Sequence, residues 1–196
     1  GQQPKVQLQI RYPYESYVER AEEEWPLTRT NWTEMYLDPT DRALTKNLIN
    51  KSNEITYDAL GEGITFLSTP MDRETEITGP VTAKIFLSSE TDDADVFLVL
   101  RAFSPDMREM VYQGSNDPHT PVALGWLRAS HRKLDKEKTL PYRPYHMHDE
   151  VQKLVPGEVY ELDVEIWPTS IVLPKGYRLG LSVRGRDYIY PGYDES

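Results

Sequence analysis

Proline is the residue that most constrains the fold of this chain, because 15 of its 196 residues are proline and they are spread along its length. A proline inside a helix removes a backbone hydrogen bond, and inside a central strand it cannot donate one to its neighbour. The chain is therefore restricted to short or interrupted elements joined by turns. This restriction favours β structure.

The clearest strand pattern lies in the segment 157–168, where apolar and acidic residues alternate. Successive residues of a strand point to opposite faces, so the alternation predicts an antiparallel strand with one buried and one polar face. Gly157 and Pro168 are expected to bound this strand. The predicted buried face consists of Tyr160, Leu162, Val164 and Ile166, and the opposite face of Glu161, Asp163 and Glu165.

Other segments carry related patterns. The segments 6–11, 81–87 and 178–184 also alternate, whereas 96–100 is apolar throughout and predicts a central strand covered on both faces. Shorter strand candidates are 32–37, 64–68, 108–113, 123–130 and 170–173. About ten short strands separated by turn residues indicate an all-β fold, a jelly-roll β-sandwich. Little helix is expected, since the best helical window, 41–48, would make barely two turns.

The charge of the chain excludes several classes of partner. Lys and Arg number 22 against 32 Asp and Glu, which gives a net charge of −10. Binding to nucleic acid depends mostly on cations that neutralise phosphates, so no nucleic-acid partner is expected. No apolar run approaches the roughly 18 residues of a membrane helix, and no membrane partner is expected. With no cysteine, disulfides and thiolate chemistry are excluded, but the compartment is not determined.

The sequence carries no complete catalytic motif. The G-x-S-x-G turn of a serine hydrolase is absent, and Ser130 next to His131 would point to the opposite face of a strand. His146 and His148 share a face if the chain is extended, but the downstream Glu and third His of a cupin metal motif are missing. We predict structural or interfacial histidines there, and no catalytic residue, metal or cofactor.

Two polar or aromatic sets remain. The alternating acids Glu161, Asp163 and Glu165 are expected to pair across strands with Arg178 and Arg184 rather than to act as a glycosidase pair. The four tryptophans suggest an alternative function, a carbohydrate-binding module with an aromatic platform. Packing or contact with a partner domain is the more frequent role of such aromatics. The four residues are Trp25, Trp32, Trp126 and Trp167.

A long resemblance to a known protein family makes the explanation by contact with a partner domain more specific. The segments 125–150 and 154–188 closely resemble the C-terminal domain of the cocaine esterase and X-prolyl dipeptidyl-peptidase (CocE/NonD) family of serine hydrolases, and 25–38 and 65–106 are also similar. The resemblance implies a jelly roll similar to galactose-binding domains. In that family the catalytic serine, acid and histidine belong to an α/β-hydrolase domain that precedes this one.

The resemblance therefore implies an accessory domain of a serine hydrolase that cleaves acyl esters or X-prolyl peptides. Its partner would be the α/β-hydrolase domain of the parent protein, on which it would pack and whose substrate cleft it would help to shape. No catalytic residue can be transferred to this chain. The candidate interface residues within the shared segment are Trp126, Arg128, His131, Arg132, Tyr142, Tyr145 and His146.

The domain boundaries follow from the extent of the resemblance. Residues 1–24 are expected to be a lead-in segment, and residues 25–196 the jelly-roll domain. The family's jelly roll usually continues beyond the Asp187-Tyr188 pair into a loop and a closing strand. We therefore expect a truncated C-terminus that leaves a strand edge exposed and favours a homo-oligomer.

Overall fold

The computed structural model describes residues 3–114 and 119–190, and the fold is all-β as predicted. A single 3-10 turn, η1 (Ala129–His131), is the only helical element in the described part. No helix among these residues is long and apolar enough to cross a membrane. The strands are β1 (Val6–Tyr12), β2 (Ser16–Glu22), β3 (Tyr36–Asp38), β4 (Ala43–Thr45), β5 (Ile64–Leu67), β6 (Thr75–Leu87), β7 (Asp95–Phe103), β8 (Glu109–Met110), β9 (Ala123–Arg128), β10 (Tyr160–Leu173) and β11 (Arg178–Arg184).

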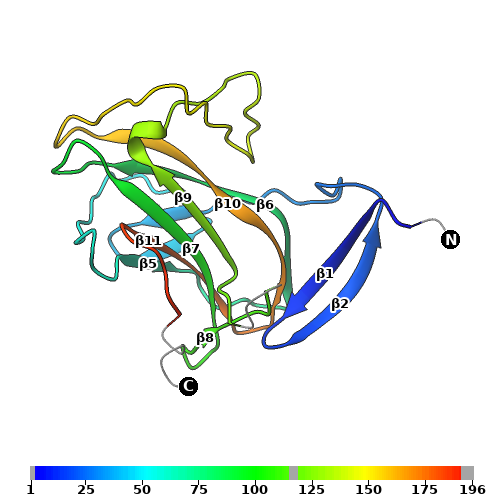
Figure 1. The fold of residues 1–196 in the computed structure, drawn as a ribbon. Coiled ribbons are helices and arrows are strands. Elements are labelled where there is room, and N and C mark those ends of the chain that lie inside the picture. The colour runs from blue at the N-terminus through cyan, green and yellow to red at the C-terminus, as the bar shows by residue number, and fades with distance from the viewer. Residues whose placement is uncertain (1–2, 115–118, 191–196) are drawn as a thin grey trace.

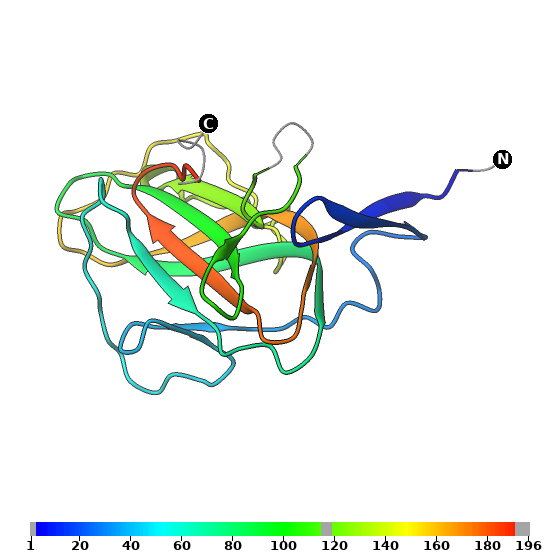
Figure 2. The same cartoon turned by 90° about the horizontal axis from the view of Figure 1, so that it is seen from below.

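The strands form one continuous path of hydrogen-bonded neighbours in the order β2-β1-β10-β9-β7-β11-β5-β4-β3. Strand β6 pairs with β10, and β8 with β7, beside this path. Most pairs are antiparallel, whereas β1 with β10 and β4 with β5 are parallel. The path curls around a shared core, as the two views in Figures 1 and 2 show.

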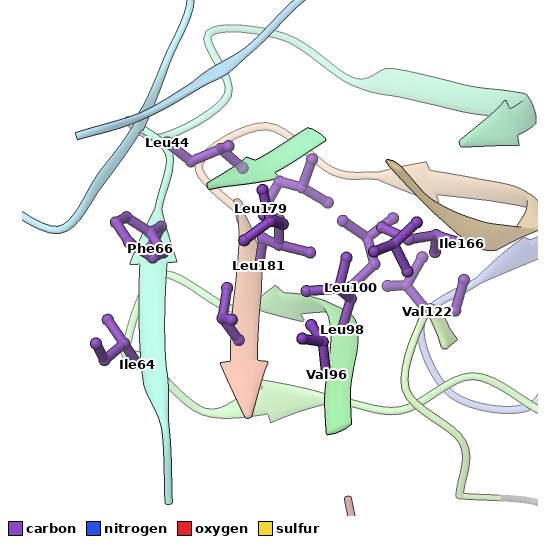
Figure 3. Close-up of a cluster of buried hydrophobic side chains, with 14 of the residues drawn as sticks. Leu44, Ile64, Phe66, Val96, Leu98, Leu100, Val122, Ile166, Leu179 and Leu181 are labelled. Carbon is purple, nitrogen blue, oxygen red and sulfur yellow. The ribbon is translucent and has the colours of Figure 1, made fainter. Parts of the chain in front are cut away.

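A single hydrophobic cluster joins the layers of this sandwich. Side chains from β5, β7, β10 and β11 point into the same space, together with Leu44 of β4 and Val122 before β9 (Figure 3). Strand β7 lies between β9 and β11, which confirms the prediction that the continuously apolar segment is a central strand. Its inward residues Val96, Leu98 and Leu100 are buried.

Strand β10 confirms the predicted alternation. Leu162, Val164 and Ile166 are buried, whereas the acids between them face outward. On β6, Ile85 is buried and Lys84 and Phe86 are exposed, again as the period-two pattern predicts. Antiparallel pairing places Leu162 opposite Ile85 and Val164 opposite Ala83, so the inward faces of the two strands line the same core.

The expected end of β10 at Pro168 was wrong. The strand continues to Leu173 and absorbs the separately predicted segment 170–173. Its register with β6 shifts between Ile166 and Thr169, so Trp167 and Pro168 together lie opposite one β6 residue, Pro80. A bulge leaves a residue without a ladder hydrogen bond, and proline has no N–H to offer.

Several shorter predictions also need correction. The helical window 41–48 contains strand β4 instead of a helix, and turns flank it. The strand expected over 32–37 begins only at Tyr36, and the one expected over 108–113 is reduced to β8 and a bridge at Tyr112. Local pattern does not set these limits, because the length of each short strand is set by its pairing with a neighbour: β3 with β4, β4 with β5, and β8 with β7.

The N-terminal hairpin of β1 and β2 projects from the body of the domain (Figures 1 and 2). It joins the rest of the sheet where Arg11 of β1 pairs with Ile171 of β10. Arg11 also donates hydrogen bonds to Val122 O and Thr169 Oγ1. The hairpin lies within the predicted lead-in, and the boundary at residue 24 stays a prediction.

Leu162 offers a direct test of this core, because it is completely buried between β6 and the facing strands. Leu162→Ala should lower the free energy of unfolding by about 2–5 kcal/mol, since it removes buried methyl groups and leaves a cavity. Leu60→Ala is the matched control, since Leu60 is 73% exposed. Its effect should stay within about 0.5 kcal/mol in urea unfolding. Equal effects of the two substitutions would contradict this placement of the core.

Gly125 allows β9 to approach β10 closely at their only registered pair in the described residues, Gly125 with Ile166. A Cβ atom at Gly125 would lie 2.3 Å from Glu165 O and 3.0 Å from Ile166 Cα. Both of these atoms are backbone atoms that cannot rotate away. The absence of a side chain therefore sets the separation of the two strands that carry Trp126 and Trp167.

Gly125→Ala should therefore push β9 away from β10 and destabilise the domain by about 1–3 kcal/mol, as overpacking does. In Gly61→Ala the new Cβ would meet Asp58 O at 3.2 Å in a surface turn, so a smaller loss is expected. Thermal unfolding followed by tryptophan fluorescence measures both variants. A Gly125→Ala protein as stable as the wild type would show that the strands can separate at no cost.

Candidate docking surface

Ser130 and His131 do not form a nucleophile and its base in this structure. Ser130 is buried in η1, and its hydroxyl donates a hydrogen bond to Asp93 Oδ2 at 2.7 Å. Its backbone N–H donates to Asp93 Oδ1 at 3.0 Å. The His131 ring instead faces His148, with 3.3 Å between the two Nδ1 atoms. A buried serine without a neighbouring base has neither the access nor the activation that nucleophilic catalysis requires.

Three histidines meet beyond the end of β9, where the sequence had suggested only a pair. The ring of His148 lies 5.4 Å from that of His131 and 5.9 Å from that of His146, measured between centroids. Together with Trp126, Leu127 and Arg128 they line a hollow of about 400 Å³. Among the described residues, no group of three or more His, Asp or Glu is arranged to hold a metal ion.

His146 is the most strongly perturbed member of this group. Burial lowers the pKa of its imidazole, and the neighbouring His148 lowers it further, while a hydrogen bond with the backbone of Asp163 opposes the shift. Its Nε2 atom is buried and has no hydrogen-bond partner among the described residues. The folded protein therefore favours the neutral form of this ring.

A lowered histidine pKa makes the folded state bind fewer protons than the unfolded state near the pKa of a free histidine, about 6.5. The stability contributed by His146 is therefore complete above that pH and is lost as the pH falls through the folded pKa. In urea unfolding, His146→Gln should lose less stability between pH 7.5 and pH 5 than the wild type. Met147→Gln, at the exposed neighbouring position, removes no titratable group and should keep the wild-type dependence. Parallel wild-type and His146→Gln profiles would contradict the role of His146.

The other predicted interface residues divide into exposed side chains and side chains that the domain itself uses. Arg132 donates to Ala129 O and Gln152 O, and its guanidinium lies 4.5 Å from the centre of the Tyr160 ring. Arg132 therefore holds the loop after η1 onto β10. Because these contacts lie within the domain, Arg132 is the weakest of the seven candidates.

The remaining candidates keep more of their surface. Arg128 is exposed and makes a two-pronged ion pair with Asp95, at 2.7 and 2.9 Å. Tyr142 stacks on Trp32 with 4.9 Å between ring centroids, and Tyr145 is exposed beside Lys138. Trp126 is exposed on β9. Of the seven, Trp126 therefore presents the clearest free apolar surface.

Trp126 belongs to an exposed aromatic pair that the strand register creates. Gly125 lies opposite Ile166, so the residues that follow them, Trp126 and Trp167, project from the outer face of β9 and β10. Their ring centroids are 5.6 Å apart, with 45° between the ring planes. The four tryptophans do not form one platform, because Trp32 stacks on Tyr142 and not on this pair.

Phe86 lies on the same outer face at the far end of β10, opposite Glu161. Phe86 is not among the predicted interface residues, although its position in the sequence carries a signal. In the alternation of 81–87 it occupies the polar register of Thr82 and Lys84, just as Trp167 continues the register of the three acids. A large aromatic in an otherwise polar register indicates an exposed apolar side chain.

The predicted ion pairs of the acidic row were wrong. Strand β10 has β6, β9 and β1 as neighbours, and it does not pair with β11, which carries Arg178 and Arg184. The cation beside the row is Lys84 of β6, which contacts both Glu161 and Asp163.

The two arginines of β11 serve other purposes. Arg178 donates to Ser68 O at 2.7 Å, and Arg184 interacts with Glu62. Both side chains are therefore engaged beside β11 and not beside β10.

Comparison with known proteins identifies the domain. Residues 1–194 match the family described as the X-Pro dipeptidyl-peptidase C-terminal non-catalytic domain. The chain belongs to this family. The family is the non-catalytic C-terminal domain of serine hydrolases, as the resemblance predicted, and the match does not favour the alternative of a carbohydrate-binding module.

Relatives show how this domain occurs in longer proteins. The fold is closely similar to a CocE/NonD family hydrolase of Staphylococcus aureus, with a TM-score of 0.91 and 26% identity. The match covers 96% of this chain and 35% of that one. An aminopeptidase of a marine sediment Thaumarchaeota archaeon shares the fold at a TM-score of 0.67 and 14% identity, over 95% of this chain and 33% of its own.

Two sequence relatives come from Mycobacterium bovis and Mycobacterium tuberculosis, and their names assign them provisionally to the serine esterases. Each is 31% identical over 129 residues, which is 63% of this chain and 19% of the relative. The chain thus spans about a fifth of the mycobacterial relatives and a third of the S. aureus hydrolase. In the similar solved structures the domain is the C-terminal part of a longer hydrolase chain. The specific likeness to galactose-binding domains stays a prediction.

Proposed function

We propose that this chain is the accessory domain of a serine hydrolase that cleaves acyl esters or X-prolyl peptides. In this proposal it packs on the α/β-hydrolase domain of the parent protein and forms part of the wall of its substrate cleft. The observation that carries the proposal is the match of residues 1–194 to a family defined as non-catalytic and C-terminal in such hydrolases.

The chemistry of the described residues supports an accessory role. The serine that stands next to a histidine in the sequence is buried and bonded to Asp93, and the histidine contacts another histidine. The hollow of about 400 Å³ at the histidines is lined by imidazoles, Trp126, Leu127 and Arg128, and no hydroxyl or carboxylate side chain lines it. Acyl transfer needs a nucleophile, a base that activates it and a group that stabilises the oxyanion. The proposal therefore places these groups in the preceding domain.

The β-sheet architecture of this domain is also suited to forming one wall of a substrate cleft. Strands are held by ladders of hydrogen bonds on both sides, so side chains on their outer faces are positioned more precisely than side chains on loops. A wall of this kind can set which substrates fit without taking part in the bond cleavage. In kinetics it would influence KM and substrate preference through binding contacts.

The test compares the parent protein with this chain in ester and X-prolyl dipeptide hydrolysis. The parent should hydrolyse a substrate of one class and lose that activity on treatment with a serine-directed phosphonate. Residues 1–196 alone should show no turnover above the uncatalysed rate in the same assays. Circular dichroism of the isolated chain provides the control for folding. Phosphonate-sensitive turnover by the isolated chain, or a parent protein inactive towards both classes, would overturn the proposal.

A further inference from the structure

One half of the outer face of the sheet, formed by β7 and β11, is covered by other parts of the chain. Arg101 on β7 forms an ion pair with Glu109, and the hydroxyl of Tyr188 donates to Glu109 Oε2 at 2.5 Å. The guanidinium groups of Arg101 and Arg184 lie 5.1 and 5.3 Å from the centre of the Tyr188 ring. The segment after β11 therefore covers β7 and β11 from outside, and Val99, which points outward on β7, is fully buried.

The other half of the same outer face, formed by β9, β10 and β6, is open. The register of β7 with β9 pairs Phe97 with Trp126 and thereby makes the two halves continuous. On the open half, Trp126, Trp167 and Phe86 are 54%, 62% and 66% exposed. Exposed tryptophan is costly in water and is enriched at protein interfaces. We call this surface, defined by Trp126, Trp167, Phe86 and the acidic row between them, the open face.

The acidic row gives the open face a definite charge. Glu161, Asp163 and Glu165 follow one another along the outer side of β10, and the nearby Lys84 compensates only the first two. Glu165 forms no ion pair or hydrogen bond through its side chain among the described residues. Glu165 is partly buried and lies opposite Thr82 of β6, whereas Lys84 lies opposite Asp163. A partly buried carboxylate that has no neighbouring cation would be stabilised by a lysine or arginine of a partner.

We infer that the open face docks on the catalytic domain of the same polypeptide, and that the docked surface of that domain is apolar with a rim of basic residues. The inference rests on the proposed function, because it assumes that a hydrolase domain precedes this one. The S. aureus hydrolase contains about two thirds of its length outside the matched domain, which supplies a partner on the same chain. A tethered partner is present at high effective concentration, so a modest surface suffices for docking.

The direct test is covalent footprinting of tryptophan in the intact parent protein with photochemically generated hydroxyl radicals. Trp32 is a matched internal control, since it is 52% exposed in this domain against 54% for Trp126. If the open face is docked, Trp126 and Trp167 should be modified at least fivefold more slowly than Trp32. Comparable rates for the three residues would overturn the inference. Protection that disappears on dilution would also overturn it, because a second copy and not the tethered domain would then cover the face.

A charge reversal tests the predicted basic rim. Glu165→Lys in the parent protein should raise the modification rate of Trp126 by threefold or more, because it places a cation against the partner's cations. Glu137→Lys, an exposed position on the loop after η1, changes the net charge equally and should leave the rate unchanged. Unchanged protection in Glu165→Lys would exclude the basic rim. The footprint does not require catalysis, so an open face that is exposed in an active hydrolase overturns the docking alone, whereas an inactive parent protein overturns the proposed function.

Discussion

The pairing of β10 with its neighbours is the interaction on which the rest of this domain depends. Strand β6 runs along β10 for almost its whole length, and on the other side β10 meets β9 at Ile166 and β1 at Ile171. The inward side chains of β10 are among the most completely buried of the described residues. Because burial and ladder hydrogen bonds act together there, β10 holds the hairpin, the sandwich and the outer face in one unit.

The same strand carries the chemistry of the surface. The alternation that buries Leu162 and Val164 must place Glu161, Asp163 and Glu165 outside, since a strand has only two faces. The bulge at Trp167 and Pro168 is followed by the last residues of β10, from Thr169 to Leu173. Trp167 lies beside Trp126 on the outer face. Strand β10 therefore contributes both the core contacts that stabilise the fold and the acidic residues of the proposed docking surface.

Much of the fold could be predicted from local pattern, and the failures have physical causes. Strand positions and their buried faces followed from the two-residue period in 81–87 and 157–168. The segment 178–184 is also a strand, but its predicted polar face is wrong, because Ser182 and Arg184 are buried as well. Pro168 did not end its strand, because a bulge accommodates a residue without an N–H group. The window 41–48 did not become a helix, because Ala43–Thr45 gained strand partners in β3 and β5 that outweigh a weak local preference.

The sequence by itself determined the all-β class, the direction of the side chains along each strand and, through a long resemblance, the family. The first two properties follow from the alternation of side chains along an extended backbone, and the family follows from similarity over much of the chain. Only the tertiary structure decided which strands are neighbours. It therefore decided that Lys84 and not Arg178 or Arg184 meets the acids, that His131 faces His148, and that one half of the outer face is left open. Those contacts join residues far apart in the chain, and their partners are selected by the burial of the whole core rather than by any local pattern.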